Sequence, residues 1–223
     1  MNRYARNLGA LTQTEQQTLQ SAAVCVVGLG GLGGYAAELL ARLGIGTITG
    51  IDADVFDTTN LNRQLFADET VLGEPKAFAA RERLRRINPD TIFNPVQQHL
   101  TADNAVALLQ GHTLIVDALD SAEDRRTLSR ACTALRVPLI HGAVEGWCGQ
   151  VALIGLGDDT MDRLYPDGHP VRRAPPVLSF TPATVAGFQV SLAVRVLLGH
   201  PLPAAGTVYF LDLSDGSVNA VRL

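Results

Sequence analysis

The stretch that decides the fold covers residues 24–34 and reads VCVVGLGGLGG. Its apolar start has the length of a buried strand, and residues 35–43, after the glycines, have helical character. Gly28, Gly30 and Gly33 fit the pattern G-x-G-x-x-G, in which missing side chains let the backbone turn sharply and approach a phosphate. The dipole at the start of the helix favours negative charge at the same point. Glycines can also merely tighten a strand-to-helix joint, but the flanking strand and helix favour a nucleotide phosphate site.

The bulk composition limits the classes of protein to consider. With 223 residues, 47% of them hydrophobic, the chain can bury one sizeable core, so we expect a single domain. A net charge of −4 argues against nucleic acid as a partner. Cys25, Cys132 and Cys148 include no Cys-x-x-Cys pair, which fits a reducing compartment and argues against a zinc site. The apolar run 182–198 is shorter than a membrane span and the N-terminus lacks a signal sequence, so we expect a cytoplasmic protein without a membrane partner.

Hydrophobic periodicity continues the alternation of strands and helices beyond the glycines. It predicts strands at residues 46–52, 92–96, 113–117 and 138–143, and helices at residues 74–87, 103–109, 123–135 and 183–198. From Trp147 the pattern changes, because the strand at 150–154 follows without a crossover helix, and the strands at 207–213 and 217–223 are joined by a hairpin signal. We therefore expect an α/β fold, with a Rossmann-like, mostly parallel sheet flanked by helices and extended by antiparallel strands in the C-terminal third.

The expected domain has three parts. Residues 1–23 form an N-terminal helical arm, residues 24–145 a nucleotide-binding part, and residues 146–223 a final part that contains a long loop at 155–179. Loops of this length are usually functional or mobile.

Acidic residues follow the predicted strands at the edge where a ligand of a parallel sheet binds. Asp52 ends the second strand about twenty residues beyond the glycines, where its carboxylate can accept hydrogen bonds from a ribose, although it can also cap a turn. Asp120 lies just beyond the fourth strand, opposite a bound triphosphate, and is a natural ligand for Mg²⁺. Asp117 is at the same edge but could simply end the strand or cap the next helix.

Basic residues supply the charge that a phosphate site needs. Lys76 is the only lysine, against seventeen arginines, and a compact ammonium suits a phosphate oxygen, although some position must hold the sole lysine by chance. We favour phosphate binding because Arg63, in an irregular insert at 54–64, supplies a second cation. The arginines later on the predicted helix are interpreted as a solvated face rather than a nucleic-acid patch, because Glu82 interrupts them. They are Arg81, Arg83, Arg85 and Arg86.

The charge of the ligand discriminates between ATP and NAD. A triphosphate carries roughly four negative charges and a dinucleotide pyrophosphate roughly two, so ATP needs the extra cations found here. The five histidines, at 99, 112, 141, 169 and 200, form no recognisable acid–base pattern, and we expect surface or packing roles for them. Transfer of AMP to a carboxylate suits such a site, because a carboxylate is already ionised at neutral pH and needs no general base.

Taken together, the motifs resemble those of the ThiF/MoeB/HesA adenylyltransferases, bacterial relatives of the ubiquitin-activating enzymes. They appear in the family's order and cover about two thirds of the chain. The matching motifs are RYAR at 3–6, GLGGLG at 28–33, DAD at 52–54, NLNRQ at 60–64, Lys76, DALD at 117–120 and GQ at 149–150.

The resemblance implies roles for individual residues. Asp52 would bind ribose, Asp120 would hold Mg²⁺, and Arg6 would enter the active site of the partner subunit of a homodimer. Arg63, Lys76, Asp120 and Arg6 would thus be the catalytic residues. The implied nucleotide site comprises Gly28, Gly30, Gly31, Gly33, Asp52, Asp54, Asn60, Arg63, Gln64, Lys76, Asp120 and Ser121.

The resemblance also implies a substrate, the C-terminal Gly-Gly carboxylate of a small ubiquitin-like sulfur-carrier protein used in thiamine, molybdopterin or related biosynthesis. The carrier's tail would run under the loop 155–179. Relatives often carry zinc-binding Cys-x-x-Cys pairs and a cysteine before the last helix, which this chain lacks, and Cys148 is a poor replacement. We therefore expect no catalytic cysteine, an acyl-adenylate as the product, and a separate sulfur donor such as a cysteine desulfurase or sulfurtransferase.

Other functions remain open from the sequence. The same chemistry could act on a peptide C-terminus or on a carboxylate of modified tRNA, although the low positive charge argues against tRNA. The chain could also be a non-catalytic nucleotide-binding module, and an oxidoreductase is a more distant alternative.

Overall fold

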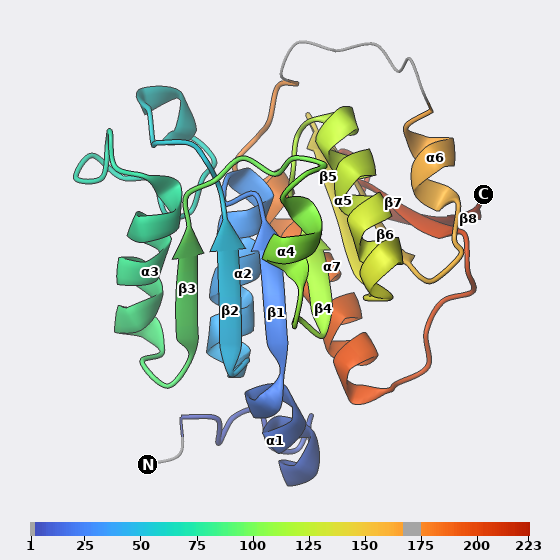
Figure 1. Ribbon diagram of the computed structural model, residues 1–223, viewed down its shortest axis with the longest axis horizontal. Coiled ribbons are helices and arrows are strands. Elements are labelled where there is room, and N and C mark those ends of the chain that lie inside the picture. The colour runs from blue at the N-terminus through green and yellow to red at the C-terminus, as the bar shows by residue number, and fades with distance from the viewer. Residues whose placement is uncertain (1–2, 167–174) are drawn as a thin grey trace.

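One sheet organises the molecule. In the computed structural model, which describes residues 3–166 and 175–223, eight strands pair in the order β3-β2-β1-β4-β5-β6-β7-β8 (Figure 1). Neighbouring strands are parallel from β3 to β5 and antiparallel from β5 to β8, which confirms the predicted fold class. The strands are β1 Ala23–Val27, β2 Thr47–Ile51, β3 Ile92–Val96, β4 Leu114–Asp117, β5 Leu139–Glu145, β6 Cys148–Ile154, β7 Thr207–Asp212 and β8 Ser217–Arg222.

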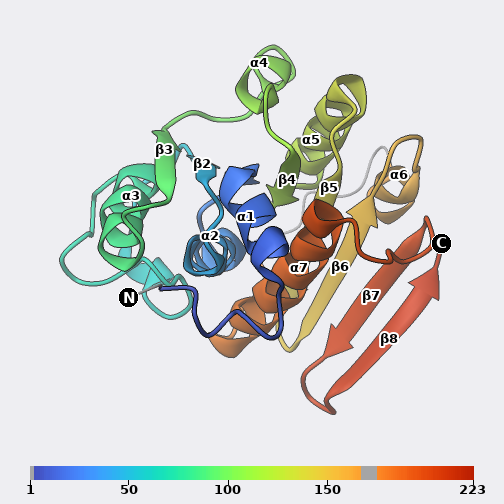
Figure 2. The same cartoon turned by 90° about the horizontal axis from the view of Figure 1, so that it is seen from below.

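Alternating side chains of the central strands fill two hydrophobic cores. Figure 2 shows α2, α3 and α7 on one face of the sheet and α4 and α5 on the other. Val24 and Val26 of β1 belong to the core on the side of α2, α3 and α7, whereas Cys25 and Val27 belong to the core that includes residues of α4, α5 and α6. Burial on both faces explains why β1 is a continuous apolar run. The helices are α1 Gln13–Ser21, α2 Gly31–Leu43, η1 Thr58–Asn60 (a 3₁₀ turn), α3 Lys76–Ile87, α4 Ala105–Leu109, α5 Ala122–Leu135, α6 Thr160–Leu164 and α7 Phe180–Leu198.

Several element boundaries differ from those predicted. α2 begins at Gly31 rather than residue 35, because its glycines leave space for the first turn to lie close to the preceding strand. α7 begins at Phe180 rather than residue 183, since Pro182 is tolerated in a first helical turn. α6 lies within the stretch 155–179 that was predicted to be a loop, and residues 167–174 of that stretch lie outside the described residues.

α7 is long and apolar enough by composition to cross a membrane. In the fold it packs against α2 and β5, and Val185, Ala186, Val190 and Ala193 lie in the core. Its apolar composition is thus explained by burial inside the domain.

Candidate active site

The glycine turn joins the carboxyl end of β1 to the start of α2. Gly28 has a φ of +88°, and a Cβ there would lie 2.6 Å from the carbonyl oxygen of Ala118, so both its conformation and its surroundings require glycine. A Cβ on Gly33 would lie 1.8 Å from the carbonyl oxygen of Gly28. These two glycines therefore serve the tight joint between strand and helix.

Gly30 and Gly31 have a different explanation. A Cβ on Gly30 would approach the Gln64 side chain at 3.5 Å, and a Cβ on Gly31 would approach Pro182 at 3.6 Å, both ordinary contacts. Packing does not require glycine at either position. Both glycines are partly exposed and no side chain caps the start of α2, so the first N–H groups of this helix, which lack partners within the helix, suit a bound phosphate.

Asp52 braces the glycine turn from the end of β2. Its carboxylate accepts hydrogen bonds from the amides of Leu29, at 2.7 Å, and Asp54, at 2.8 Å. Burial raises the pKa of Asp52, partly opposed by the nearby positive charge of Lys76. Asp52 thus holds the turn in shape as well as lying where a ribose is expected, and the ribose contact stays a prediction.

Lys76 is buried, which is unusual for a lysine. It is the first residue of α3, only 8% of its side chain is exposed, and its ammonium donates to Asp54 at 2.8 Å. The Asp54 side chain is 70% exposed, and contact between the ammonium and a phosphate stays a prediction. The burial of the only lysine argues against a position held by chance.

The insert after Asp54 folds back towards the glycine turn. Asn60 is buried and accepts the amide of Asp57 in a local capping arrangement. Arg63 donates to the carbonyl of Thr59 at 2.7 Å, and its side chain would lie 3.9 Å from a Cβ on Gly31. The Gln64 side chain is buried beside Gly30, and its Oε1 accepts no hydrogen bond from the described residues.

The loop between β4 and α5, residues 118–121, lies on the other side of the site, and we call it the aspartate loop. Val27 and Asp117 are paired across β1 and β4, and Gly28 lies against Ala118, so this loop touches the glycine turn. Asp120 is exposed and forms no hydrogen bond or ion pair within residues 3–166 and 175–223. Ser121 caps α5 by accepting the amide of Asp124 at 3.3 Å, so its hydroxyl already has a structural role.

These residues fit a nucleotide with Mg²⁺. Mg²⁺ is usually held by one or two protein carboxylates together with phosphate oxygens and water, and the exposed carboxylate of Asp120 matches that need. Among the described residues no group of three His, Cys, Asp or Glu side chains could hold a metal alone, so phosphate oxygens would have to complete the coordination.

Arg6 lies far from this site within the chain. The arm that carries it is anchored by Tyr4, whose hydroxyl accepts from Asn88 at 2.9 Å and whose ring lies against Gly44. Gly44 and Asn88 follow α2 and α3, at the amino ends of the parallel strands, whereas the glycine turn is at their carboxyl ends (Figure 1). Arg6 therefore lies at the opposite edge of the sheet from its own chain's glycine turn, and its predicted role in a partner's site is untested.

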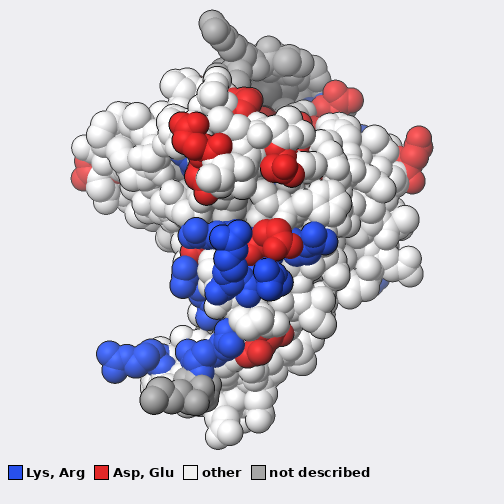
Figure 3. All heavy atoms as spheres, turned by 90° about the vertical axis from the view of Figure 1, so that its left-hand side faces the viewer, with Lys and Arg blue, Asp and Glu red and all other residues white. Residues whose placement is uncertain are grey.

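The basic face of α3 is partly neutralised. Figure 3 shows arginines gathered with an acidic residue on this side of the molecule. Arg81 and Arg85 form ion pairs with Glu82, and Arg83 pairs with Glu38. These pairs are consistent with the predicted solvated face.

The sequence interpretation missed a buried polar cluster behind the aspartate loop. Asp117, which was placed at the ligand edge but could simply have ended the strand or capped the next helix, is fully buried and accepts a hydrogen bond from Nδ1 of His141 at 2.7 Å. His141 lies in the interior, as a packing role would require, but it is also hydrogen-bonded to Asp117. Another of the five histidines, His169, lies outside the described residues. The parallel pairing of residues 113–117 with 138–143 was the only available signal, because it places these two side chains side by side.

The cysteines differ in accessibility. Burial raises the pKa of the Cys25 thiol and raises that of Cys132 to about 12, which disfavours the reactive thiolate. Cys148 is exposed at the start of β6.

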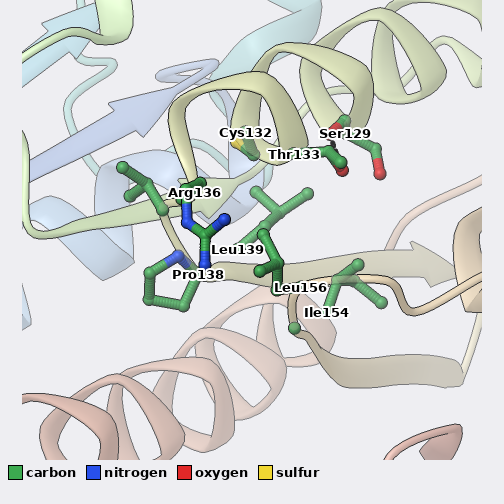
Figure 4. A pocket seen from close by; sticks show the side chains of 10 residues that line it. Ser129, Cys132, Thr133, Arg136, Pro138, Leu139, Ile154 and Leu156 are labelled. Atoms are coloured by element: carbon green, nitrogen blue, oxygen red, sulfur yellow. Dashed lines mark hydrogen bonds between the residues drawn. The ribbon is translucent and has the colours of Figure 1, made fainter.

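A small hollow elsewhere takes no part in this site. It has a volume of about 170 Å³ and lies between the end of α5 and the β5–β6 pair, lined by Arg136, Leu139 and Leu156 among others (Figure 4). Because it opens at the amino end of β5, it faces away from the edge that carries Asp120.

The sequence of this chain is similar to those of known proteins. The sequence matches the model of the ThiF family over residues 4–223. It is 33% identical to the molybdopterin-synthase adenylyltransferase of Salmonella typhimurium, covering 93% of this chain and 86% of that protein. It is 31% identical to the SAMP-activating enzyme E1 of Haloferax volcanii, covering 99% of this chain and 84% of that protein.

Two solved structures illustrate the range of similar folds. E. coli tRNA N6-threonylcarbamoyladenosine dehydratase, TcdA, has a TM-score of 0.76 and 29% identity, covering 88% of this chain and 94% of that chain. E. coli MccB with ATP has a TM-score of 0.84 and 20% identity, covering 100% of this chain and 71% of that chain. At that lower identity the second likeness concerns the fold alone.

Proposed function

This chain belongs to the ThiF family and is an adenylyltransferase, and on that premise we propose that it activates the C-terminal Gly-Gly carboxylate of a small ubiquitin-like sulfur-carrier protein. The product is an acyl-adenylate, and pyrophosphate is released. The names of the relatives, which refer to molybdopterin synthase, SAMP and a sulfur carrier protein, support this substrate class. The reaction would serve thiamine, molybdopterin or related sulfur-transfer biosynthesis in the cytoplasm.

The observation that carries the proposal is the partly exposed start of α2 at Gly30 and Gly31, which no side chain caps. Packing does not explain these glycines, and they lie beside the insert that holds Arg63 and Gln64, whose Oε1 accepts no hydrogen bond from residues 3–166 and 175–223. Lys76 lies buried at the start of α3, and among the described residues its ammonium pairs with one exposed carboxylate, that of Asp54. A site with amide donors, two cations and a separate carboxylate suits a triphosphate better than the pyrophosphate of a dinucleotide.

The residues act on charge and position rather than on protons. In the proposed step, an oxygen of the carrier's carboxylate bonds to the α-phosphorus while the bond to the departing pyrophosphate breaks. The amides of the glycine turn, Arg63 and Lys76 would lower the repulsion between the two anions. Mg²⁺ bound at Asp120 would neutralise charge on the phosphates and on the leaving pyrophosphate.

Carrier-dependent exchange between ATP and radiolabelled pyrophosphate tests the proposal. We expect exchange with a carrier that ends in Gly-Gly and none with the same carrier shortened by its last glycine. Asp120→Ala should lower the rate by about a hundredfold or more. Asp103→Ala removes another exposed carboxylate and should leave the rate unchanged. Exchange that is insensitive to Asp120→Ala would contradict the assigned site.

A second substrate class is favoured by one comparison. TcdA, named as a tRNA dehydratase, is 29% identical to this chain over most of both proteins. A carboxylate on modified tRNA is therefore the alternative, with a peptide C-terminus as a further candidate. Pyrophosphate exchange that depends on tRNA and declines steeply with salt would favour it over the carrier.

A homodimer would complete the site. Arg6 lies near the amino ends of the parallel strands, away from its own chain's glycine turn, so it could contribute only to the site of a partner subunit. Mixing Arg6→Ala subunits with Asp120→Ala subunits should restore part of the activity, since some dimers would then contain one intact site. No recovery at all would contradict action across subunits.

A separate sulfur donor, such as a cysteine desulfurase or sulfurtransferase, would then use the acyl-adenylate. We expect no covalent intermediate between enzyme and carrier. A DTT-sensitive enzyme–carrier thioester after incubation with ATP would contradict this expectation.

A further inference from the structure

A buried polar network lies directly behind the aspartate loop and has no part in the phosphate chemistry described above. We call it the Asp117 network. It is formed by Asp117 at the end of β4, His141 on β5, Gln150 on β6, Arg125 in the first turns of α5, and Tyr165 at the end of α6. Asp117 and His141 are completely buried, and Arg125 and Tyr165 are at most 8% exposed.

The hydrogen bonds fix one protonation pattern for the network. His141 donates from Nδ1 to Asp117 at 2.7 Å, so its Nε2 is an acceptor, 3.0 Å from the Gln150 amide and 3.3 Å from the Tyr165 hydroxyl. The same hydroxyl accepts from Gln150 at 2.7 Å and from Arg125 at 2.6 Å. Burial lowers the pKa of His141 and raises that of Tyr165 to about 12, so both side chains are neutral and Arg125 balances the charge of Asp117.

The network holds the peptide next to Asp120. Asp117 accepts the amide N–H of Leu119 at 3.0 Å, and Arg125 donates to the Leu119 carbonyl at 2.5 Å. Gln189, on α7, donates to the backbone carbonyl of Asp117 at 2.8 Å. Both polar groups of residue 119 are thus bound to buried side chains, whereas the neighbouring Asp120 has no bonding partner in the described chain. The direction of the Asp120 side chain therefore depends on backbone that this network fixes.

A purely structural role does not account well for the network. Burying an Arg–Asp pair costs desolvation energy, and apolar side chains of similar volume often stabilise a core better. Here Nε of Arg125 is 3.8 Å from Asp117 and makes no hydrogen bond among the described residues. Buried polar residues that cost desolvation energy in this way are often retained because they orient a functional group.

We propose that Tyr165 and His141 are positioning residues for Asp120, acting through Arg125 and Asp117. This inference rests on the proposed function, since it assumes that Asp120 binds Mg²⁺. Tyr165 accepts a hydrogen bond from Nη1 of Arg125, whose Nη2 donates to the Leu119 carbonyl, and His141 fixes the carboxylate of Asp117 that binds the Leu119 amide. Loss of either contact would let the peptide at residue 119 rotate and move the Asp120 carboxylate away from the phosphates.

Tyr165→Phe is the sharpest test, because it removes the hydroxyl and keeps the aromatic ring, whose centroid lies 5.0 Å from Cζ of Arg125. Calorimetric titration of the full chain, without carrier, should show Mg·ATP binding weakened about ten- to hundredfold. Binding of AMP without metal should be unchanged, because AMP does not depend on Asp120. Tyr209→Phe, on β7 and outside the network, is the matched control and should bind both nucleotides normally.

A double-mutant cycle separates positioning from general destabilisation. If Tyr165 acts through Asp120, then Tyr165→Phe should have no further effect on Mg·ATP binding in an Asp120→Ala background. His141→Asn retains a donor for Asp117 and should weaken Mg·ATP binding less than His141→Leu does. These results would support the proposal.

Three results would overturn it. Equal weakening of AMP and Mg·ATP by Tyr165→Phe would indicate a structural role, and an additive effect in the Asp120→Ala background would show that Tyr165 does not act through Asp120. Normal binding of Mg·ATP by Tyr165→Phe would also refute the inference while leaving the proposed function intact. Wild-type protein that binds no Mg·ATP would instead refute the proposed function itself.

Discussion

Gly33 offers the most demanding test of the glycine turn, because Gly34 beside it provides a matched control on the same helix. A Cβ on Gly33 would lie 1.8 Å from the Gly28 carbonyl oxygen and 3.2 Å from the Cβ of Ala118. A Cβ on Gly34 would make only ordinary contacts, at 3.6 Å to Phe66 and 3.7 Å to its other nearest neighbours. The two alanine substitutions therefore differ in their surroundings and hardly at all in their chemistry.

The expected cost of Gly33→Ala follows from what the new methyl group meets. The obstructing atom is a backbone oxygen, and Gly28 cannot move away readily because it lies against the Ala118 carbonyl and has a φ of +88°. Overpacking of a core typically costs about 1–3 kcal/mol, so a rigid backbone clash should cost about 3 kcal/mol or more. For a chain of this size that lowers the melting temperature by about 6–12 °C. Gly34→Ala relieves the poor helix propensity of glycine and should gain up to about 1 kcal/mol.

Thermal unfolding of both variants, followed by circular dichroism and calorimetry, measures these differences. We expect Gly33→Ala to melt well below the wild type and Gly34→Ala to melt at or slightly above it. If Gly33→Ala melted at the wild-type temperature, the close approach of α2 to the glycine turn would be wrong. Equal losses in both variants would show that helix geometry, and not the clash with Gly28, sets the requirement for glycine.

Three other outcomes test the site and its surroundings. Gly31→Ala should fold normally, since its Cβ makes ordinary contacts, but should weaken ATP binding by about tenfold or more; titration of the folded variant checks this. An acyl-phosphate ATP probe that labels lysines should modify Lys76 and no other internal site, and peptide mapping that found only the N-terminal amine labelled would place Lys76 outside the site. Burial lowers the pKa of His141 below its ordinary 6.5, so the unfolded chain binds that proton first and stability declines as the pH falls below about 6.5. Relative to His141→Asn, the wild type should lose about 1.4 kcal/mol per pH unit in this range, and parallel denaturation profiles for the two proteins would refute the buried neutral imidazole.

Local sequence was sufficient wherever the governing interactions are local. The apolar run 24–27, the spacing of Gly28, Gly30 and Gly33, and the helix that follows are contiguous, so periodicity and glycine spacing predicted the strand, turn and helix together. The change to antiparallel strands was predictable because no residues are available for a crossover helix between residues 143 and 150. Asp52 and Asp120 do follow β2 and β4 at the carboxyl edge of the sheet, as their spacing predicted, while their binding roles stay predictions.

Tertiary structure decided the features that depend on distant residues. Only the strand order places Asp117 beside His141, and only the packing of α5 and α6 brings Arg125 and Tyr165 to that pair. Only the fold shows that Lys76 is buried against an exposed partner. The physical reason is that periodicity records which face of an element is apolar, whereas burial of a charge depends on which other elements cover it.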